Sequence, residues 1–338
     1  MLVSVKANPN PSLLDALSRA GASFDVGSSG ELQLIRSLSK SSYLSLVCPG
    51  KTAPLLREAM DLRVDQVVLD SAEECRRYAD VLARVPAKVP QSALLRVNPV
   101  RPCVDAGEIM GGLPAQFGID EERLPEALGA AVSRGLDIAG THFFLGSQIR
   151  STKAICGNFR AAAETTLAVS HATDLRIRTI NFGGGFGIPH QDSDSTLDLV
   201  EIAETAESSL NALHRALGRP VAGQVEAGRF IFGDAGVYAC RIIEVKESRG
   251  IRFVVVDSGM TGFTRPAASW GEDHPIWKLG CDYLAGPALD VEKYVVVGPT
   301  CFSGDILGRE TYLSRPREDD ILIVGNAGAY GSTLSLGK

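Results

Sequence analysis

Apolar residues follow two alternating patterns along the first two-thirds of the chain. Short runs rich in β-branched residues alternate with longer stretches in which apolar residues recur at helical spacing. The predicted strands are Leu2–Lys6, Ser23–Val26, Tyr43–Val47, Gln66–Leu69, Ala93–Val97, Asp137–Phe143, Thr179–Phe182 and Gly223–Glu226. The predicted helices are Ser12–Ala20, Thr52–Leu62, Ala72–Ala83, Leu124–Ser133 and Leu197–Ala216. This alternation predicts an α/β fold, a (β/α)8 TIM barrel, rather than an open sheet.

The pattern changes after residue 231. Strand-like runs then follow one another without helices between them, and Gly and Pro separate them. These runs are Val237–Val245, Arg252–Val256, Lys293–Val297, Glu310–Leu313 and Asp320–Val324. We therefore predict two domains, a barrel over residues 1–231 and a mostly antiparallel β domain over residues 232–338.

Polar residues and glycines stand at the ends of the predicted barrel strands. In a barrel of parallel strands the carboxyl ends meet at one mouth, and functional residues gather there. The residues at these positions are Lys6, Asp25, Arg96, His142, Gly183–Gly185 and Glu226. The sequence therefore places the functional site at this mouth.

Composition excludes some classes of function. The net charge is −6 and no run of Lys and Arg is present, which argues against a nucleic-acid partner. No apolar stretch is long enough for a membrane span. The cysteines are scattered without CxxC pairs, so we expect neither a disulfide framework nor a metal site. We predict a cytoplasmic protein with mostly buried thiols.

A lysine at the mouth of a barrel has a specific chemical use. When Lys6 is desolvated there, its pKa falls, and its amine can form a Schiff base with an aldehyde cofactor. A lone lysine after a strand is more often a solvated surface residue. Lys6 can therefore be assigned this role only together with the other residues of the site.

Two motifs later in the barrel fit a phosphorylated aromatic cofactor. The glycines of Asn181–Gly187 let backbone N–H groups approach an anion, although a tight turn is the alternative and the spacing is not that of a dinucleotide site. Glu226 could pair with a protonated ring nitrogen, and Arg229 could reach a phosphate. An ordinary ion pair at a strand end is the alternative for these two residues.

Further candidate residues have structural alternatives as well. Phe144 could stack on a flat cofactor while Ser147 meets its phosphate, or Phe144 and His142 could be core residues. Cys301, four residues before Asp305, could donate a proton or be structural. The hydroxyl group of Tyr330 follows a Gly-rich turn and could bind phosphate.

The order of these motifs resembles that of the fold-type III pyridoxal 5′-phosphate (PLP) decarboxylases. This family includes the ornithine/arginine and diaminopimelate decarboxylases. The resembling segments are Val5–Asn8, Phe24–Leu32, Gly146–Gln148, Gly183–Phe186, Glu226–Arg229, Cys301–Asp305 and Gly328–Tyr330. The resemblance therefore covers essentially the whole chain.

The resemblance implies a role for each candidate. Lys6 would form the internal aldimine with PLP and Asp25 would lie near it, while Glu226 would pair with the pyridine nitrogen. The remaining cofactor-binding residues would be Arg96, His142, Phe144, Ser147, Gly183, Gly184, Gly185, Gly228, Arg229 and Tyr330. Cys301 and Asp305 would reach into the active site of the partner subunit of a homodimer, where the thiol would donate a proton.

Departures from the family pattern narrow the substrate. The position of the second His of the usual His-x-His-x-Gly-Ser motif is Phe144, and the Glu of the diaminopimelate motif Cys-Glu-Ser is Phe302. Ile109–Gly118 resembles the biosynthetic-cluster branch, which includes decarboxylases of glutamyl groups on carrier proteins. We therefore expect an L-amino acid, free or carrier-tethered, with a distal end that is not a simple ammonium. Its contacts would include Arg265, Cys301, Phe302 and Asp305.

Two alternatives stay open at the level of sequence. A fold-type III amino-acid racemase is one, although Cys301 and Glu226 argue against it. A non-catalytic PLP-binding homologue is the other. It is favoured by the chain ends, because related enzymes usually continue before Lys6 and beyond Tyr330. We therefore expect a β domain that is incomplete at both ends.

Overall fold

The computed structural model describes residues 1–84, 92–100, 106, 108–173, 175–191, 194–264, 274–279 and 291–335. The chain forms two compact units. The first consists of Met1–Gly187 and Thr196–Gly228, and the second of Ile188–Ser195 and Arg229–Lys338. The short segment Ile188–Ser195 lies within the predicted barrel but groups with the second unit.

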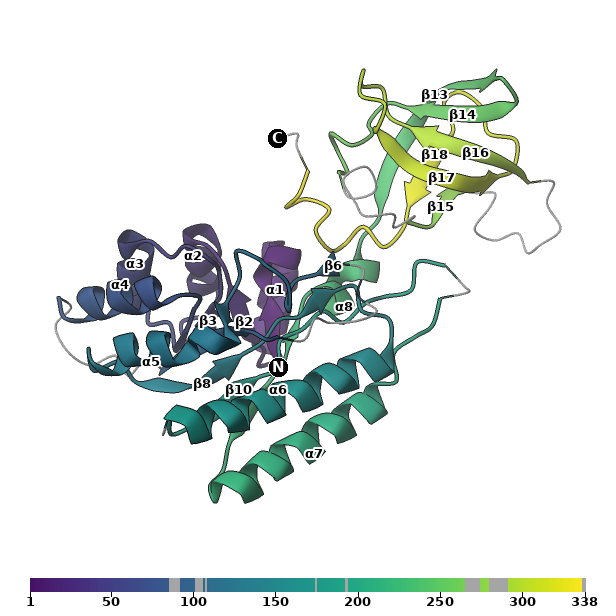
Figure 1. Cartoon of the computed structure of the whole chain (residues 1–338). Coiled ribbons are helices and arrows are strands. Elements are labelled where there is room, and N and C mark those ends of the chain that lie inside the picture. Colours follow the sequence, from purple (N-terminus) through teal and green to yellow (C-terminus); the bar gives the residue numbers. More distant parts are fainter. Residues whose placement is uncertain are drawn as a thin grey trace. The chain divides into compact units, whose positions relative to one another are not determined.

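The first unit is built around a parallel sheet (Figure 1). Its main strands are β1 (Leu2–Ser4), β2 (Ser23–Val26), β3 (Leu44–Leu46), β4 (Gln66–Leu69), β5 (Ser92–Asn98), β8 (Ile138–His142), β10 (Thr179–Asn181), β11 (Ala222–Gln224) and β12 (Glu226–Ala227). β11 pairs with β10 and β12 pairs with β1, and only Val225 separates β11 from β12. The segment Ala222–Ala227 therefore closes the sheet, and the predicted barrel is confirmed.

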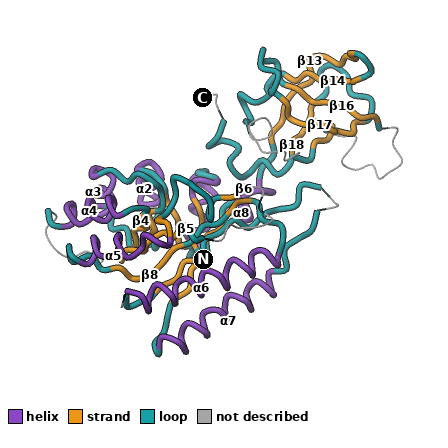
Figure 2. Tube along the Cα trace, viewed as in Figure 1, coloured by secondary structure: helices purple, strands orange, loops and turns teal. Residues whose placement is uncertain are grey.

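Helices connect the barrel strands (Figure 2). They are α1 (Pro11–Arg19), α2 (Ser29–Leu38), α3 (Ala53–Asp61), α4 (Ala72–Leu82), α5 (Leu124–Val132), α6 (Thr152–Thr173) and α7 (Leu199–Leu217). Side-chain caps fix several of their starts: Asn10 accepts from the N–H groups of Ser12 and Leu13, and Asp198 from those of Val200 and Glu201. α2 and α6 were not among the predicted helices.

Short elements at the mouth of the barrel complete the first unit. They are β6 (Glu108–Ile109), which pairs with β9 (Gly146–Ser147), β7 (Ile119–Asp120), and the 3-10 turns η1 (Val5–Ala7) and η2 (Glu121–Arg123). The predicted strand Leu2–Lys6 was too long, because β1 ends at Ser4 and Lys6 lies in η1. The backbone N–H of Asn8 bonds to the carbonyl of Val5, so the chain turns here instead of continuing the ladder.

The second unit is a six-stranded sheet of order β15-β18-β13-β14-β16-β17. Its strands are β13 (Tyr238–Ser248), β14 (Ile251–Val256), β15 (Ile276–Lys278), β16 (Glu292–Val297), β17 (Ile306–Leu313) and β18 (Ile321–Val324), preceded by α8 (Arg229–Phe232) and η3 (Gly233–Ala235). Among the described strands of this unit, the pairings are antiparallel except that of β14 with β16, which confirms the mostly antiparallel prediction. Ile242, Val254, Val256, Val296 and Leu322 belong to its apolar core.

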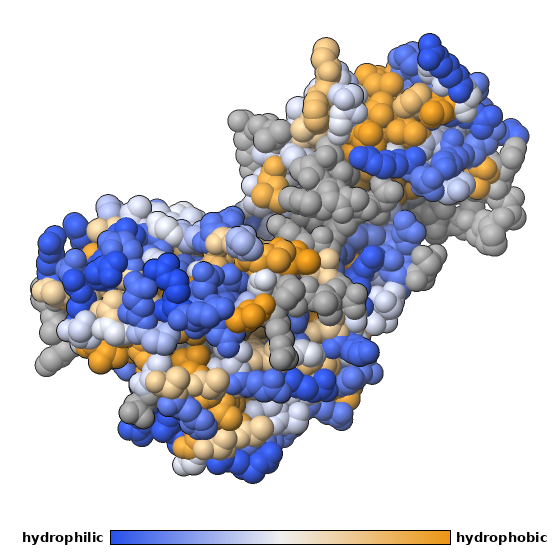
Figure 3. Space-filling view, viewed as in Figure 1, coloured by the Kyte–Doolittle hydropathy of each residue, from blue (hydrophilic) through white to orange (hydrophobic). Residues whose placement is uncertain are grey.

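The surface of each unit mixes charged and apolar side chains. Figure 3 shows apolar atoms among polar ones over β13 and β14, whose exposed side chains include Ile243, Val245 and Ile251. Among the described helices, none combines the length and the apolar run that a bilayer span requires.

Candidate active site

Strand register brings polar residues together inside the barrel, near its carboxyl mouth. His142 of β8 lies opposite Arg96 of β5 on one side and opposite Asn181 of β10 on the other. Ser4 of β1 lies opposite Asp25 of β2. Residues directly opposite each other point to the same face of a sheet. The predicted meeting of strand-end residues is therefore present in the first unit.

Lys6 and the buried Asp25 form an ion pair at this mouth. The Lys6 Nζ lies 2.7 Å from Asp25 Oδ2, and the Ser4 hydroxyl donates to the same oxygen at 2.8 Å. Asp25 is fully buried, and this burial raises the pKa of its carboxyl against the opposing charge of Lys6. The Lys6 side chain keeps 37% of its surface exposed. The amine is thus held by Asp25 while part of the Lys6 side chain stays exposed.

Glu226 is the centre of a second group of hydrogen bonds. Its Oε1 accepts hydrogen bonds from His142 Nε2 at 2.9 Å and Asn181 Nδ2 at 3.0 Å. Its Oε2 is buried and has no hydrogen-bond partner in the described part of the chain. Burial opposes the charge of this carboxyl, but the interactions with His142, Lys6 and Arg96 prevail and lower its pKa to about 2. Glu226 is therefore an ionised carboxylate whose Oε1 accepts two hydrogen bonds and whose Oε2 accepts none from the described residues.

The glycine loop after β10 runs close to two neighbouring strands. Gly183 and Gly185 have positive φ angles of 77° and 92°. A β-carbon on Gly183 would lie 2.0 Å from the Phe143 carbonyl oxygen, and one on Gly184 would lie 2.3 Å from that of Glu226. Only glycine fits this path. The Gly183 N–H donates to Asn181 Oδ1 at 2.8 Å, so this N–H is engaged within the chain.

A buried charge network supports Arg96. The Lys51 Nζ lies 3.1 Å from Asp70 Oδ2 and 3.0 Å from Glu74 Oε2, and the Lys51 side chain has no exposed surface. Asp70 Oδ1 in turn lies 3.6 Å from the Arg96 Nη1. Sequence reasoning did not single out Lys51, Asp70 or Glu74. The signal available was the position of Lys51 and Asp70 just after β3 and β4.

Two aromatic rings lie near the Arg96 guanidinium. Its Cζ is 4.6 Å from the ring centroid of Phe117 and 5.8 Å from that of Phe144. A cation over an aromatic face is attracted by the ring quadrupole. Phe144, at the position of the family histidine, therefore meets a permanent cation without being able to carry a charge itself.

Two of the predicted phosphate ligands belong to the second unit. Arg229 opens α8, and its guanidinium lies 5.1 Å from the Tyr330 ring centroid. Ser147, Gly183–Gly185 and Gly228 belong to the first unit. A phosphate site shared by these residues stays a prediction.

The loop that carries Cys301 is organised by Asp305. Cys301 and Phe302 are exposed, whereas Asp305 is 2% exposed. Its carboxylate accepts from the Met260 N–H at 2.6 Å and from the Thr300 hydroxyl at 2.7 Å. Asp305 thus supports its own loop, and a direct contact with substrate stays a prediction. Arg265 lies outside the described residues.

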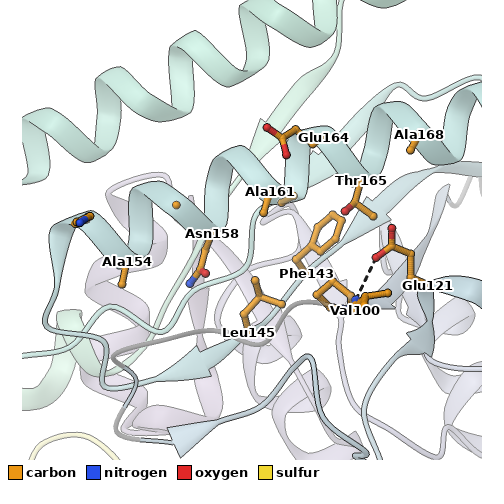
Figure 4. A pocket seen from close by; sticks show the side chains of 14 residues that line it. Val100, Glu121, Phe143, Leu145, Ala154, Asn158, Ala161, Glu164, Thr165 and Ala168 are labelled. Carbon is orange, nitrogen blue, oxygen red and sulfur yellow. Dashed lines mark hydrogen bonds between the residues drawn. The ribbon is translucent and has the colours of Figure 1, made fainter.

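A groove of about 780 Å³ lies beside the barrel and is separate from these residues (Figure 4). Phe143 and Leu145 point into it from the segment that follows β8, toward Ala154, Asn158 and Ala161 of α6. They alternate with His142 and Phe144, and consecutive residues of an extended segment face opposite sides. The groove is therefore on the other side of this segment from His142.

Comparison with known proteins identifies the family. The model of the pyridoxal-binding domain of the pyridoxal-dependent decarboxylases matches residues 2–233. The L-glutamyl-[BtrI acyl-carrier protein] decarboxylase of Niallia circulans is 28% identical over 98% of this chain and 78% of the relative. The diaminopimelate decarboxylase of Methanothermobacter thermautotrophicus is 32% identical over 98% of this chain and 75% of the relative.

Solved structures show the same fold. The crystal structure of diaminopimelate decarboxylase from Helicobacter pylori complexed with L-lysine has a TM-score of 0.85 and 23% identity, covering all of this chain and 81% of that one. The fold and the matched domain agree. The chain belongs to the pyridoxal-dependent decarboxylases of fold type III.

Proposed function

We propose that the protein decarboxylates an L-amino acid or an amino-acid conjugate, with PLP bound at Lys6. The observation that carries the proposal is the state of Glu226. Its carboxylate is buried and ionised, one oxygen accepts two hydrogen bonds, and the other oxygen has no partner among the described residues. Such an oxygen suits a protonated ring nitrogen.

The residues at the mouth fit this cofactor. Buried polar atoms are nearly always hydrogen-bonded, yet within the described residues Glu226 Oε2 and Asp25 Oδ1 are not. A bound group with a protonated nitrogen would satisfy Glu226 Oε2. Lys6 would hold the group covalently, and the backbone of Gly184 and Gly185 with Ser147 would hold its phosphate. When bound, PLP supplies an electron sink for the carbon that loses carbon dioxide.

The chain's own residues then have distinct tasks. Glu226 favours the positive charge on a ring nitrogen because an opposite charge lies beside it. Asp25, which also accepts a hydrogen bond from the Ser4 hydroxyl, fixes the Lys6 Nζ, which can accept or release a proton there. The substrate carbon that loses carbon dioxide must gain a proton, and we assign its donation to the Cys301 Sγ.

The substrate proposal rests on two departures and two relatives. Phe302 cannot form an ion pair with a distal ammonium, and Phe144, unlike the histidine of the usual motif, can neither carry a charge nor donate a hydrogen bond. Besides the carrier-protein glutamyl decarboxylase, a 2-[(L-alanin-3-ylcarbamoyl)methyl]-2-hydroxybutanedioate decarboxylase of Staphylococcus aureus is 26% identical over 99% of this chain and 84% of the relative. Both relatives act on amino acids in conjugated form, and we propose the same for this protein in a biosynthetic pathway.

We also propose a homodimer with shared active sites. The exposure of Cys301 and Phe302 on a loop held by Asp305 supports this assembly, because these side chains are available to a partner. The racemase alternative has no support, since the relatives named above are decarboxylases and Glu226 is a carboxylate.

The test is an assay of carbon dioxide release by the PLP-loaded protein. The panel contains free diaminopimelate, lysine, ornithine and glutamate, and glutamyl and other aminoacyl groups on a carrier protein. Release from a conjugate that exceeds release from the free diamines supports the proposal. Racemisation without carbon dioxide would reject the decarboxylase assignment, and preference for diaminopimelate would reject the substrate assignment alone.

A further inference from the structure

We propose that Asn181 is a positioning residue that couples the Glu226 carboxylate to the glycine loop, so that the two ends of a bound cofactor are set together. The inference rests on the proposed function for its catalytic consequence. The coupling itself is a property of the chain and is measurable without a cofactor.

The fold places Asn181 between the two groups it joins. Asn181 ends β10 and lies opposite His142 of β8 and Gln224 of β11. Glu226 follows Gln224 by two residues and therefore points to the same side of the barrel wall. Asn181 has no exposed surface, so water does not compete for its amide.

Both ends of the Asn181 amide are used, and its orientation is determined. Gly183 N–H can only donate, so the oxygen of the amide must face it, at 2.8 Å. The amide nitrogen then faces Glu226 Oε1 at 3.0 Å, where it donates to an ionised carboxylate. Neither leucine nor an ionised aspartate at this position can make both bonds.

The two bonds act on different parts of the site. With His142, Asn181 fixes Oε1 of Glu226 and thereby sets the orientation of Oε2, which is buried and has no hydrogen-bond partner among the described residues. The titratable groups that act on Glu226 are His142 of β8, Lys6 of η1, Arg96 of β5 and Asp25 of β2.

At its other end Asn181 holds the start of the glycine loop. The loop is also tied to Glu226 directly, since the Glu226 N–H bonds to the Gly183 carbonyl at 2.8 Å. Asn181, Gly183 and Glu226 therefore form a closed set of hydrogen bonds. A shift of the glycine loop therefore changes the position of the Glu226 carboxylate, and a shift of the carboxylate changes the position of the loop.

Two substitutions separate these roles. Asn181→Asp keeps an acceptor for the Gly183 N–H but loses the donor to Glu226, and Asn181→Leu loses both. Thr141→Val is the matched control: Thr141 is buried on the neighbouring strand, and its hydroxyl bonds to Thr166 at 2.7 Å, away from Glu226.

The expected results differ between the variants. Both Asn181 variants weaken PLP binding about tenfold, because a hydrogen bond to a charged group is lost. Both move the acid limb of the kcat/KM profile to higher pH, since Glu226 loses a donor that favours its charged form. In the cofactor-free protein, exchange of the Gly183 amide speeds up in Asn181→Leu and stays slow in Asn181→Asp. Thr141→Val lowers Tm and changes none of these.

Other outcomes overturn the proposal. If Asn181→Leu lowers Tm as Thr141→Val does but leaves Gly183 exchange and the acid limb unchanged, Asn181 is only a structural residue. Failure of the proposed function is a separate result: the wild-type protein would then bind no PLP, while the exchange of Gly183 would still confirm or reject the coupling.

Discussion

His142 and Asn181 lie opposite each other on neighbouring strands, and both donate to the same oxygen of Glu226. Both donors are therefore engaged with Oε1, and Oε2 has no hydrogen-bond partner among the described residues. A carboxylate in this state is ionised and held in a fixed orientation, as an ion pair with a protonated ring nitrogen requires. The relation depends on strand register, because a shift of one residue would turn either side chain out of the barrel.

The charge of Glu226 contributes a pH-dependent part of stability. Its pKa falls from 4.5 to about 2 on folding, so its contribution is present above pH 4.5 and is lost as the pH falls toward 2. We expect Glu226→Gln to lower the free energy of unfolding at pH 7 by about 3 kcal/mol. Denaturant titrations of both proteins should converge as the pH falls through this window. A difference that is independent of pH would contradict the ionised state.

The buried lysine behind Arg96 is expected to be important for stability. Lys51→Met leaves Glu74 buried without its cation and leaves Asp70 with only the 3.6 Å contact to Arg96, which costs about 3–5 kcal/mol of unfolding free energy. Arg19→Met is the control, because Arg19 forms an exposed pair with Asp15 and its loss costs less than about 1 kcal/mol. Equal effects in urea unfolding would show that the buried network carries no special weight.

The glycine loop is expected to reject any side chain. Gly184→Ala puts a β-carbon against the Glu226 carbonyl and should cost about 1–3 kcal/mol together with most of the affinity for PLP. Gly30→Ala in α2 meets nothing within 4 Å and should stabilise by about 0.5–1 kcal/mol. Thermal unfolding and PLP titration measure both. Wild-type affinity in Gly184→Ala would remove the loop from the cofactor site.

The exposed thiol is expected to affect turnover and not cofactor binding. Cys301→Ala should lower kcat at least about 100-fold, as loss of a general acid does, while PLP affinity stays unchanged. Cys156→Ala, which removes a buried thiol of α6, should lower only stability. A Cys301→Ala enzyme with normal kcat would assign proton donation to another group.

The sequence predicted the barrel well because fully buried parallel strands are short apolar runs that pattern alone can detect. It missed α2, whose start in Gly27–Gly30 resembles a loop. The signal was present: Ser28 caps the Glu31 N–H, and Glu31 accepts from the Gly27 N–H. It also missed α6, in which alanines weaken the apolar periodicity.

The candidate site was predictable only in part. Lys6, Asp25, His142 and Glu226 stand at or near the ends of the predicted strands, and the order of their motifs matches a known family. The roles of Asn181 and of the buried charges Lys51, Asp70 and Glu74 were not predicted, because these roles depend on contacts with residues from other parts of the chain. Asn181 and Glu226 are 45 residues apart and become neighbours only through register.

The most direct test of the central claim is to fix the cofactor to the chain and locate it. The protein is loaded with PLP, reduced with borohydride and digested, and the peptides are weighed by mass spectrometry. The account predicts one reduced PLP adduct, on the peptide that contains Lys6, and none in Lys6→Ala. An adduct on another lysine, or no adduct on the wild-type protein, would contradict it.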